Sequence, residues 1–430
     1  MKMGHLAGKN LYPDLRKRVD QNAVGAPDTK EMYEILKLVF SEDDARIAAQ
    51  MPMMFSSLGT ISKRTGIDQA ELKPKLASMA DRGLVFDFEI RGKMLYMLAP
   101  PVVGFFEFSM MRERKDIDQK RMSELLHHVL IDDPTFMQSF SRSEASPFRV
   151  RVHETALDEG TFSEILDYER AVQMVEDAGK WSVALCHCRH VAHHLGRDCR
   201  KFPMESCLSL GMGADYTIRH GMAREISRQN AMELLVESRE KGLVHTGDNV
   251  QHRPTFLCLC CGCCCEVINS FKKFVDYDPP FSSNFEARID PLLCNGCGKC
   301  ARACPAEVID LVEKEHPVKG RVFKKLCKVE TEVCLGCGVC HATCKFGAIS
   351  LKRRSRQKIT PESAIKRVLT HAIDQGKLAN LILDQGNGIG TAVANRMLTA
   401  ILALPPAKQA LASRQVKSRF VDMMAAKVKV

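Results

Sequence analysis

The distribution of cysteine constrains this chain more than any other feature of its sequence. All 19 cysteines lie at or after Cys186 in a chain of 430 residues. The odd number argues against a complete set of disulfides, and the opening residues MKMGHLAGKN contain no apolar run that could serve as a signal peptide. We therefore expect a protein of the reducing cytoplasm whose cysteines bind metal as thiolates.

A cysteine repeat with a specific spacing lies in the second half of the chain. The pattern C-x2-C-x2-C-x3-C occurs at residues 294–304 and again at 334–344, and an apolar, strand-like run follows each copy. Two such copies resemble the bacterial dicluster ferredoxin, which holds two [4Fe–4S] clusters. The resemblance covers residues 290–351 alone. A pair of zinc ribbons is the alternative, but zinc takes four tetrahedral ligands and has no use for a run of three closely spaced cysteines.

The resemblance implies two clusters with crossed ligands, because the last cysteine of each repeat binds the cluster of the other repeat. It assigns Cys294, Cys297, Cys300 and Cys344 to the first cluster, and Cys334, Cys337, Cys340 and Cys304 to the second. The chain departs from the family where Lys345 replaces the proline expected after Cys344, and where a long insertion, residues 305–333, carries the unassigned Cys327. We expect the Lys345 cation to raise the potential of the first cluster.

Ten further cysteines precede the repeat: Cys186, Cys188, Cys199, Cys207, Cys258, Cys260, Cys261, Cys263, Cys264 and Cys265. Cysteine is often a small buried apolar residue, but six cysteines within residues 258–265 are too dense for packing alone. A C-x-C pair at the end of each of two predicted strands would direct two pairs of thiolates into one pocket, and Cys199 and Cys207, on a predicted loop, would complete a site. We predict one or two additional iron–sulfur clusters here, with ligands among these ten cysteines.

Four histidines accompany the first of these cysteines: His187, His190, His193 and His194. One interpretation is a metal ligand or a proton donor beside a cluster. The other, which we favour, is a polar face shared with the neighbouring arginines Arg189 and Arg197.

The remaining patterns predict an α+β chain of several domains. The order helix, helix–turn–helix and hairpin near the N-terminus resembles a winged helix, and residues 148–152 alternate like a half-buried strand. Two similar helix–strand units follow that strand, so we predict an internal duplication with a ferredoxin-like βαβ core. The predicted segments are a basic, turn-rich arm (1–27), the winged helix (28–100), a helical linker (101–146), a cysteine-rich α/β domain (147–275), the ferredoxin domain (284–352) and a basic helical extension (353–430).

Positive charge is concentrated near the end of the chain. Residues 352–430 contain 15 Lys and Arg against four Asp and Glu, a net charge of +11, whereas the whole chain carries +10. We therefore expect the extension, which begins with Arg353, Arg354, Arg356 and Lys358, to dock an acidic redox partner. Attraction to nucleic acid and peripheral contact with anionic lipid are the alternatives. The longest weakly charged stretch, residues 94–106, is too short to span a bilayer.

The order of winged helix, cysteine-rich domain and dicluster ferredoxin resembles a family of ferredoxin-domain proteins of anaerobic bacteria. This implies an electron-transfer protein or oxidoreductase subunit that relays single electrons between a low-potential donor and a flavoprotein, ferredoxin or metalloreductase, with no activity of its own. One alternative is a redox enzyme with a catalytic iron–sulfur site in the middle domain, although no catalytic residue is identifiable. The other is a redox-sensing DNA-binding regulator, which we disfavour because the predicted recognition helix, residues 68–82, has balanced charges.

Overall fold

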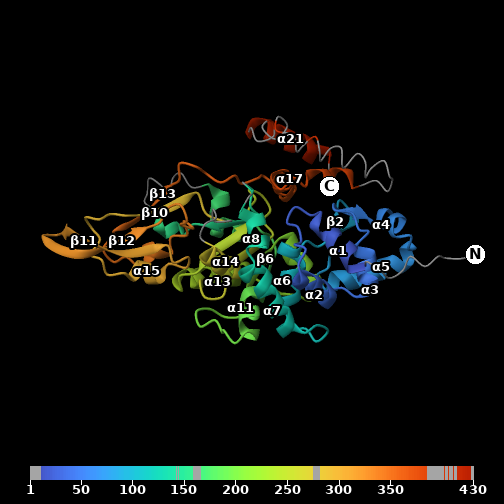
Figure 1. Cartoon of the computed structure of the whole chain (residues 1–430), viewed down its shortest axis with the longest axis horizontal. Helices are drawn as coiled ribbons and strands as arrows, with labels where there is room; N and C mark the ends of the chain where they lie inside the picture. Colours follow the sequence, from blue (N-terminus) through green and yellow to red (C-terminus); the bar gives the residue numbers. More distant parts are fainter. Residues whose placement is uncertain are drawn as a thin grey trace, which may run out of the picture. The chain divides into compact units, whose positions relative to one another are not determined.

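The computed structural model describes residues 11–141, 143, 145–157, 166–274, 281–384, 401, 405, 410 and 414–427. The chain divides into two compact units, the first formed by residues 1–129 with 368–430 and the second by residues 130–367. Both units contain helices and strands, in agreement with the predicted α+β class (Figure 1). No helix in the described segments is long and apolar enough to cross a membrane.

The first unit contains helices around a small antiparallel sheet. Its elements are α1 (Leu11–Asp20), α2 (Lys30–Val39), α3 (Glu42–Ala48), β1 (Ser56–Ser57), α4 (Leu58–Thr65), α5 (Gln69–Asp81), β2 (Val85–Ile90), β3 (Lys93–Leu98), α6 (Phe106–Met110), α7 (Gln119–His127), α18 (Leu378–Leu383) and α21 (Arg414–Lys427). Thr29 caps α2, since its hydroxyl accepts a hydrogen bond from the Met32 N–H (3.3 Å). The sheet has the order β1-β3-β2, and β2 and β3 form the predicted hairpin at Arg91 and Gly92, both with positive φ.

Residues Leu11–Asp20, before the first predicted helix, form a helix of their own, so the prediction of a turn-rich arm over residues 1–27 is wrong for this part. In α1, Leu15 and Val19 lie four positions apart and are buried, and the helix packs against α2 and α3. Arg18 is buried as well: it pairs with Asp384 (2.5 Å), which also accepts the Met53 N–H (2.8 Å). Part of the basic extension therefore belongs to the same unit as α1. Residues 1–10, 385–400 and most of 402–413 lie outside the described residues.

The first part of the predicted helical linker belongs to the core of the first unit. Phe105, Phe106 and Met122 have no exposed surface there. Gly83 follows α5 with φ 76°, and a Cβ at this position would lie 2.2 Å from the Cβ of Phe108. The glycine is thus required both for the turn and for the close approach of α6. Because the first unit extends to residue 129, the prediction of a linker over 101–146 is wrong for this part.

The second unit is built on a six-stranded sheet with the order β4-β8-β9-β6-β5-β7. Its strands are β4 (Phe148–Arg151), β5 (Trp181–Leu185), β6 (Glu205–Leu210), β7 (Arg224–Ile226), β8 (Val244–Asp248) and β9 (Phe256–Cys260). Its helices include α8 (Pro134–Ser141), α10 (Ala171–Glu176), α11 (His187–His194), α12 (Met212–Arg219), α13 (Arg228–Glu240) and α14 (Glu266–Lys273). Neighbouring strands pair antiparallel. Because β6 and β7 both pair with β5, they run parallel to each other on either side of it, and α12 connects them. This connection returns the chain to the same end of the sheet, as in the βαβ unit of the predicted ferredoxin-like core.

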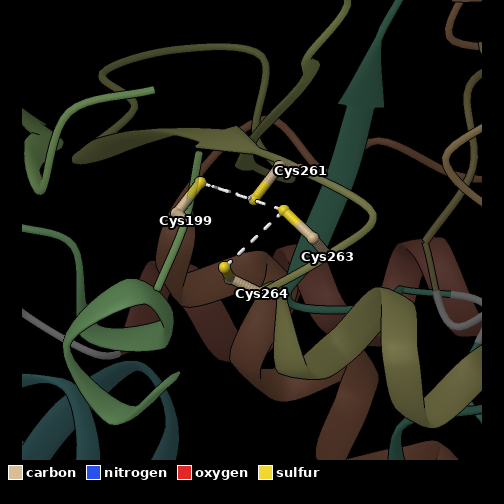
Figure 2. A group of neighbouring side chains, drawn as sticks. All are labelled: Cys199, Cys261, Cys263 and Cys264. Atoms are coloured by element: carbon tan, nitrogen blue, oxygen red, sulfur yellow. Dashed lines mark hydrogen bonds between the residues drawn. The ribbon is translucent and has the colours of Figure 1, made fainter. Parts of the chain in front are cut away.

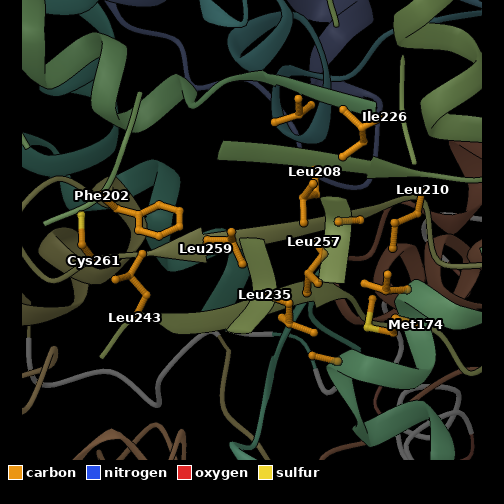
Figure 3. Packing of buried hydrophobic residues seen from close by; sticks show 14 of the residues in the cluster. Met174, Phe202, Leu208, Leu210, Ile226, Leu235, Leu243, Leu257, Leu259 and Cys261 are labelled. Carbon is orange, nitrogen blue, oxygen red and sulfur yellow. The ribbon is translucent and has the colours of Figure 1, made fainter. Parts of the chain in front are cut away.

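The two faces of this sheet differ in composition. Leu208 of β6 and Leu257 of β9 lie in an apolar core that also contains Leu235 of α13 (Figure 3). Because successive side chains of a strand point to opposite faces, Cys258 and Cys260 of β9 lie on the face opposite to Leu257. The sheet thus places thiols on the face opposite to this apolar core.

The first strand, β4, is buried along its whole length, although its alternation predicted a half-buried strand. Its Arg149 is buried and pairs with Glu169 (2.9 Å), the last residue of a short 3₁₀ turn. Glu169 also pairs with Arg353 (3.2 Å) and accepts a hydrogen bond from Asn284 (2.9 Å). A charged residue in an alternating strand pattern predicts an exposed side chain. Here a carboxylate from another part of the sequence, Glu169, neutralises the charge of Arg149 and allows its side chain to be buried.

Residues 281–353 form the part of the second unit that carries the cysteine repeat. Strands β10 (Phe285–Ile289) and β13 (Ile349–Arg353) pair antiparallel, and the short helices α15 (Lys299–Ala303) and α16 (Val339–Ala342) contain the third cysteine of each repeat. The insertion between the repeats is a hairpin of β11 (Ile309–Val318) and β12 (Arg321–Val329). A further helix, α17 (Ala364–Asp374), follows this part of the chain.

Candidate metal centres

Two cavities in the ferredoxin-like part are lined by the cysteines of the repeat. The first is lined by Cys294, Cys297, Cys300 and Cys344. The second is lined by Cys334, Cys337, Cys340 and Cys304. The structure thus brings together the same two crossed sets of four that the resemblance to dicluster ferredoxins implies, with the last cysteine of each repeat at the cavity of the other.

Glycines in the cysteine loops bring backbone N–H groups to sulfur. The N–H groups of Gly296 and Gly336 donate to the Sγ atoms of Cys294 and Cys334, each at 3.4 Å. Both glycines have positive φ. A Cβ at position 296 would lie 2.1 Å from the Lys325 carbonyl oxygen, and a Cβ at position 336 would lie 2.0 Å from the Phe285 carbonyl oxygen. Only glycine fits these turns. Such N–H donors stabilise the negative charge of a thiolate, so the loops suit anionic metal ligands.

Cys327, which the sequence left unassigned, lies at the first cavity. It is a buried residue of β12, and its own N–H donates to the Sγ of Cys294 (3.5 Å). Burial, together with a hydrogen bond to Cys300, raises the pKa of the Cys327 thiol to about 12. The first cavity therefore holds a fifth sulfur that stays protonated at neutral pH.

Six of the ten earlier cysteines form one half-buried collection of thiols, here called the six-thiol group: Cys186, Cys188, Cys207, Cys258, Cys260 and Cys265. Cys207 and Cys258 are paired across β6 and β9. The β9 pair has the predicted C-x-C strand geometry, but Cys186 is the N-cap of α11 and Cys188 lies inside that helix. The prediction that Cys186 and Cys188 also lie on a strand is wrong, because the chain turns into a helix directly after β5.

Hydrogen bonds between the thiols, together with burial, leave the pKa values of Cys186, Cys188, Cys258, Cys260 and Cys265 above the usual value. A hydrogen bond from Cys260 favours the Cys258 thiolate, but burial and the charge of Cys207 outweigh it and raise the pKa of Cys258 to about 11. The pKa of Cys186 is also well above its usual value, through its hydrogen bond to Cys188 and through burial. Metal binding at this group would therefore release protons.

The other four cysteines form a separate cluster, here called the four-thiol group: Cys199, Cys261, Cys263 and Cys264 (Figure 2). Cys199 lies in the loop before β6, whereas Cys207 lies within β6, so the prediction that both lie on one loop is wrong. A hydrogen bond from Cys264 and the nearby Arg189 guanidinium outweigh burial and lower the pKa of Cys261 to about 4. At least one thiol of this group is therefore ionised at neutral pH.

Two charged side chains beside these thiols were not identified as functional from the sequence. Arg189 is buried and its Nε donates to the Sγ of Cys199 (3.4 Å). Glu266 is buried against His187, with 2.7 Å between Oε2 and Nε2, and both lie next to Cys188. The interpretation of the histidines as a polar face is wrong for His187, which lies in the interior. The sequence offered one sign of the Glu266–His187 pair: Glu266 directly follows the cysteine run, at the start of a helix.

The comparisons with known proteins concern the cysteine repeat. Residues 293–365 match the family model described as a 4Fe-4S dicluster domain. No curated protein and no solved structure shows significant similarity to the chain. The match supports a ferredoxin-like domain with 4Fe–4S cluster binding in this segment, which suggests an iron–sulfur electron-transfer role. The prediction of a ferredoxin-like domain is confirmed by this match.

Proposed function

We propose that this protein relays single electrons between a low-potential donor and a partner oxidoreductase, such as a flavoprotein, a ferredoxin or a metalloreductase, in the cytoplasm of an anaerobe. The observation that carries the proposal is the crossed arrangement of the repeat, in which two sets of four cysteines each line one cavity. We assign one [4Fe–4S] cluster to each cavity, the first to that of Cys344 and the second to that of Cys304. When bound, such clusters exchange one electron at low potential.

We assign a third iron–sulfur cluster to the six-thiol group, at the opposite end of an electron path. This group flanks the turn of residues 261–264, and within that turn Gly262 lies directly against Pro305, since a Cβ on it would be 2.6 Å from the Pro305 carbonyl oxygen. Pro305 follows Cys304 and lines the second cavity. Electrons entering at the six-thiol group would therefore pass to the second cluster and then to the first.

The docking surface that we propose for the partner lies at the first cavity. Phe346 lines this cavity and is 50 % exposed, and Leu292, two residues before Cys294, is 64 % exposed. Large exposed apolar side chains mark protein contacts when they adjoin a functional site. The exposed cations Lys352 and Arg356 of the basic extension would supply the charge that attracts an acidic partner.

Two arginines of the predicted docking segment have structural roles instead. Arg353 pairs with Glu169 and stacks on Phe285 (4.9 Å). Arg354 pairs with Glu286 (3.3 Å) and donates to the carbonyls of Thr331 and Cys334, at the start of the second cysteine loop. These residues hold β13 in place, so a test of docking must spare them.

We further propose that the N-terminal helices and hairpin form a winged helix over residues 28–100 that binds protein and not DNA. The element order and the β1-β3-β2 sheet support this fold. Arg82, near the end of the predicted recognition helix, is committed to Asp44 (2.7 Å), and Lys75 to Glu71 (3.3 Å). The helix thus lacks the basic surface that neutralises phosphates.

The proposed clusters can be counted in the full chain purified without oxygen. The two ferredoxin clusters account for about 8 iron atoms and the six-thiol group for about 4 more, at four per cubane. Cys300→Ser should lose the electron paramagnetic resonance signal of the first reduced cluster, while the matched variant Cys327→Ser, in the same cavity, should keep it. A colourless protein, or equal iron loss in both variants, would contradict the assignment.

Electron relay itself is tested by stopped-flow absorption of the cluster bands. A reduced low-potential ferredoxin should bleach the bands, and an oxidised flavoprotein should restore them. Replacing Phe346 by Ser should slow the second step while leaving iron content unchanged, since the side chain lies at the rim of the first cavity. Bands that respond to neither partner would contradict the relay.

One observation favours a second candidate function, catalysis at the six-thiol group. Glu266 is buried beside His187 and Cys188, and its Oε1 atom has no hydrogen-bond partner among the described residues. A carboxylic acid and a histidine next to a metal cluster are groups that can deliver protons to a bound substrate. A substrate-dependent spectral change at this cluster, lost in Glu266→Gln, would establish an enzyme in place of a relay.

A further inference from the structure

The four-thiol group has sulfur positions that separate it from every other cysteine set in the described chain. Its four Sγ atoms all lie within 4.8 Å of one another. Cys199 is 3.7 Å from Cys261 and 3.8 Å from Cys263, and Cys264 is 3.7 Å from Cys263 (Figure 2). Among the described residues no set of four ferredoxin cysteines is gathered this tightly.

These distances are those of sulfur atoms that share a single metal ion. Zinc–thiolate bonds of about 2.3 Å in a tetrahedron place the sulfur atoms about 3.8 Å apart. In a cubane each thiolate binds a different iron atom, so the thiolates are separated by the inorganic core and stand farther apart. The four-thiol group therefore has room for one ion and not for a cluster, so among the ten candidate cysteines we exclude these four as ligands of an iron–sulfur cluster.

The surroundings of the group suit a closed, permanently charged site. Four thiolates around a divalent ion carry a net charge of −2, and the buried Arg189 offsets part of it through its hydrogen bond to Cys199. Arg189 is itself held by Ser206 (2.6 Å) and by the Leu259 carbonyl (2.8 Å), so its charge is fixed at this position. A fixed cation beside thiolates stabilises the anionic form that metal binding requires.

We propose that Cys199, Cys261, Cys263 and Cys264 bind one zinc ion in a mononuclear, structural site. All four tetrahedral positions are taken by protein sulfur, which is the closed arrangement of structural zinc and leaves no position for a substrate. Zinc binds a thiolate site more tightly than ferrous iron does. The ion replaces the thiol protons and undergoes no change of oxidation state, so the site stands outside the electron path.

The site fixes the turn that separates the six-thiol group from the second cavity. Cys260 and Cys265, both of the six-thiol group, flank this turn directly. Gly262 in its centre packs on Pro305, and its carbonyl accepts a hydrogen bond from Lys272 (2.9 Å), which also pairs with Glu307 (2.8 Å). Zinc would therefore hold the spacing between two redox centres by clamping the turn to the loop of Cys199.

The test is a count of zinc and iron in the same anaerobic preparation of the full chain. Wild-type protein should contain one zinc ion per chain, and X-ray absorption at the zinc edge should give four sulfur neighbours at about 2.3 Å. The double variant Cys199→Ala, Cys263→Ala should lower zinc by about tenfold or more and keep the iron of the ferredoxin clusters. The matched variant Cys265→Ser, in the six-thiol group, should keep zinc and lower iron.

Several results would overturn the proposal. They are wild-type protein without zinc, a zinc edge dominated by nitrogen or oxygen, and a loss of iron with unchanged zinc in the double variant. A mononuclear iron signal that disappears in the double variant would also overturn it. Because the absorption measurement uses wild-type protein, a double variant that does not fold leaves the proposal testable. Loss of the ferredoxin clusters would contradict the proposed function without bearing on zinc.

Discussion

Replacing Glu169 by Gln should destabilise the second unit strongly, because this buried carboxylate neutralises two arginines. Its side chain is 3 % exposed and pairs with Arg149 at 2.9 Å and with Arg353 at 3.2 Å. Removing one partner of a buried pair costs about 3–5 kcal/mol, since the remaining charge is left without compensation. The amide oxygen of Gln can still accept one hydrogen bond, so we expect a loss near the lower limit, about 3 kcal/mol.

The single tryptophan, Trp181, reports on this unit, because it lies in β5 and donates to the Val175 carbonyl (2.7 Å). Urea unfolding of the anaerobic protein, followed by its fluorescence, should show a clearly lower midpoint for Glu169→Gln. The matched control is Glu205→Gln, which removes an exposed ion pair with Arg224 (2.7 Å) in the same unit and should cost less than about 1 kcal/mol. Coincident midpoints for the two variants would refute the reasoning.

Three further predictions concern the clusters and the buried histidines. Gly336→Ala should lower the iron content, because its Cβ would lie 2.0 Å from a carbonyl oxygen. The control Gly320→Ala has a similar positive φ but no atom within 4 Å of its Cβ, so it should keep full iron. Equal iron content in both variants would contradict the steric argument. Cys344→Ser should change the resonance signal of the first reduced cluster and spare the second, and the reverse pattern would show that the ligands are not crossed. Burial lowers the pKa of His153 to about 4, from 6.5, and that of His245 well below its usual value, so only the unfolded chain gains these protons as the pH falls. The stability of the second unit should therefore drop between about pH 6.5 and pH 4, by about 3 kcal/mol for His153 alone, and a flat urea midpoint over this range would contradict that account.

The features that could be predicted from the sequence are those set by short-range spacing. The first three cysteines of each repeat follow one another at a fixed spacing, and the resemblance to dicluster ferredoxins supplied the fourth cysteine of each set from the other repeat. The fold of the cysteine-rich domain could not be predicted, because the antiparallel order of its six strands depends on pairings between distant segments. Local periodicity indicates that strands exist but contains no information about their neighbours.

The candidate metal centres show the same limit at the level of single residues. Cys260 and Cys261 are adjacent in sequence but belong to different thiol groups, because β9 ends at Cys260 and the chain then turns. Gly262 was the available sign of that turn, and strand geometry could not be extended past it. The burial of some basic residues was missed for a related reason. The partner of Arg18, Asp384, lies 366 positions away in sequence, and a charge count treats both side chains as exposed to solvent.

The division of the chain into units has a consequence for how the protein is made. The first unit is assembled from both ends of the chain, and the whole second unit lies between them in sequence. A ribosome therefore releases all the cysteines before it completes residues 377–384, which supply Lys377 and Asp384 as partners for α1. Since domains fold as units during synthesis, metal loading of the second unit can begin while the first is still incomplete. Closure of the first unit around α1 would then follow synthesis of the whole second unit.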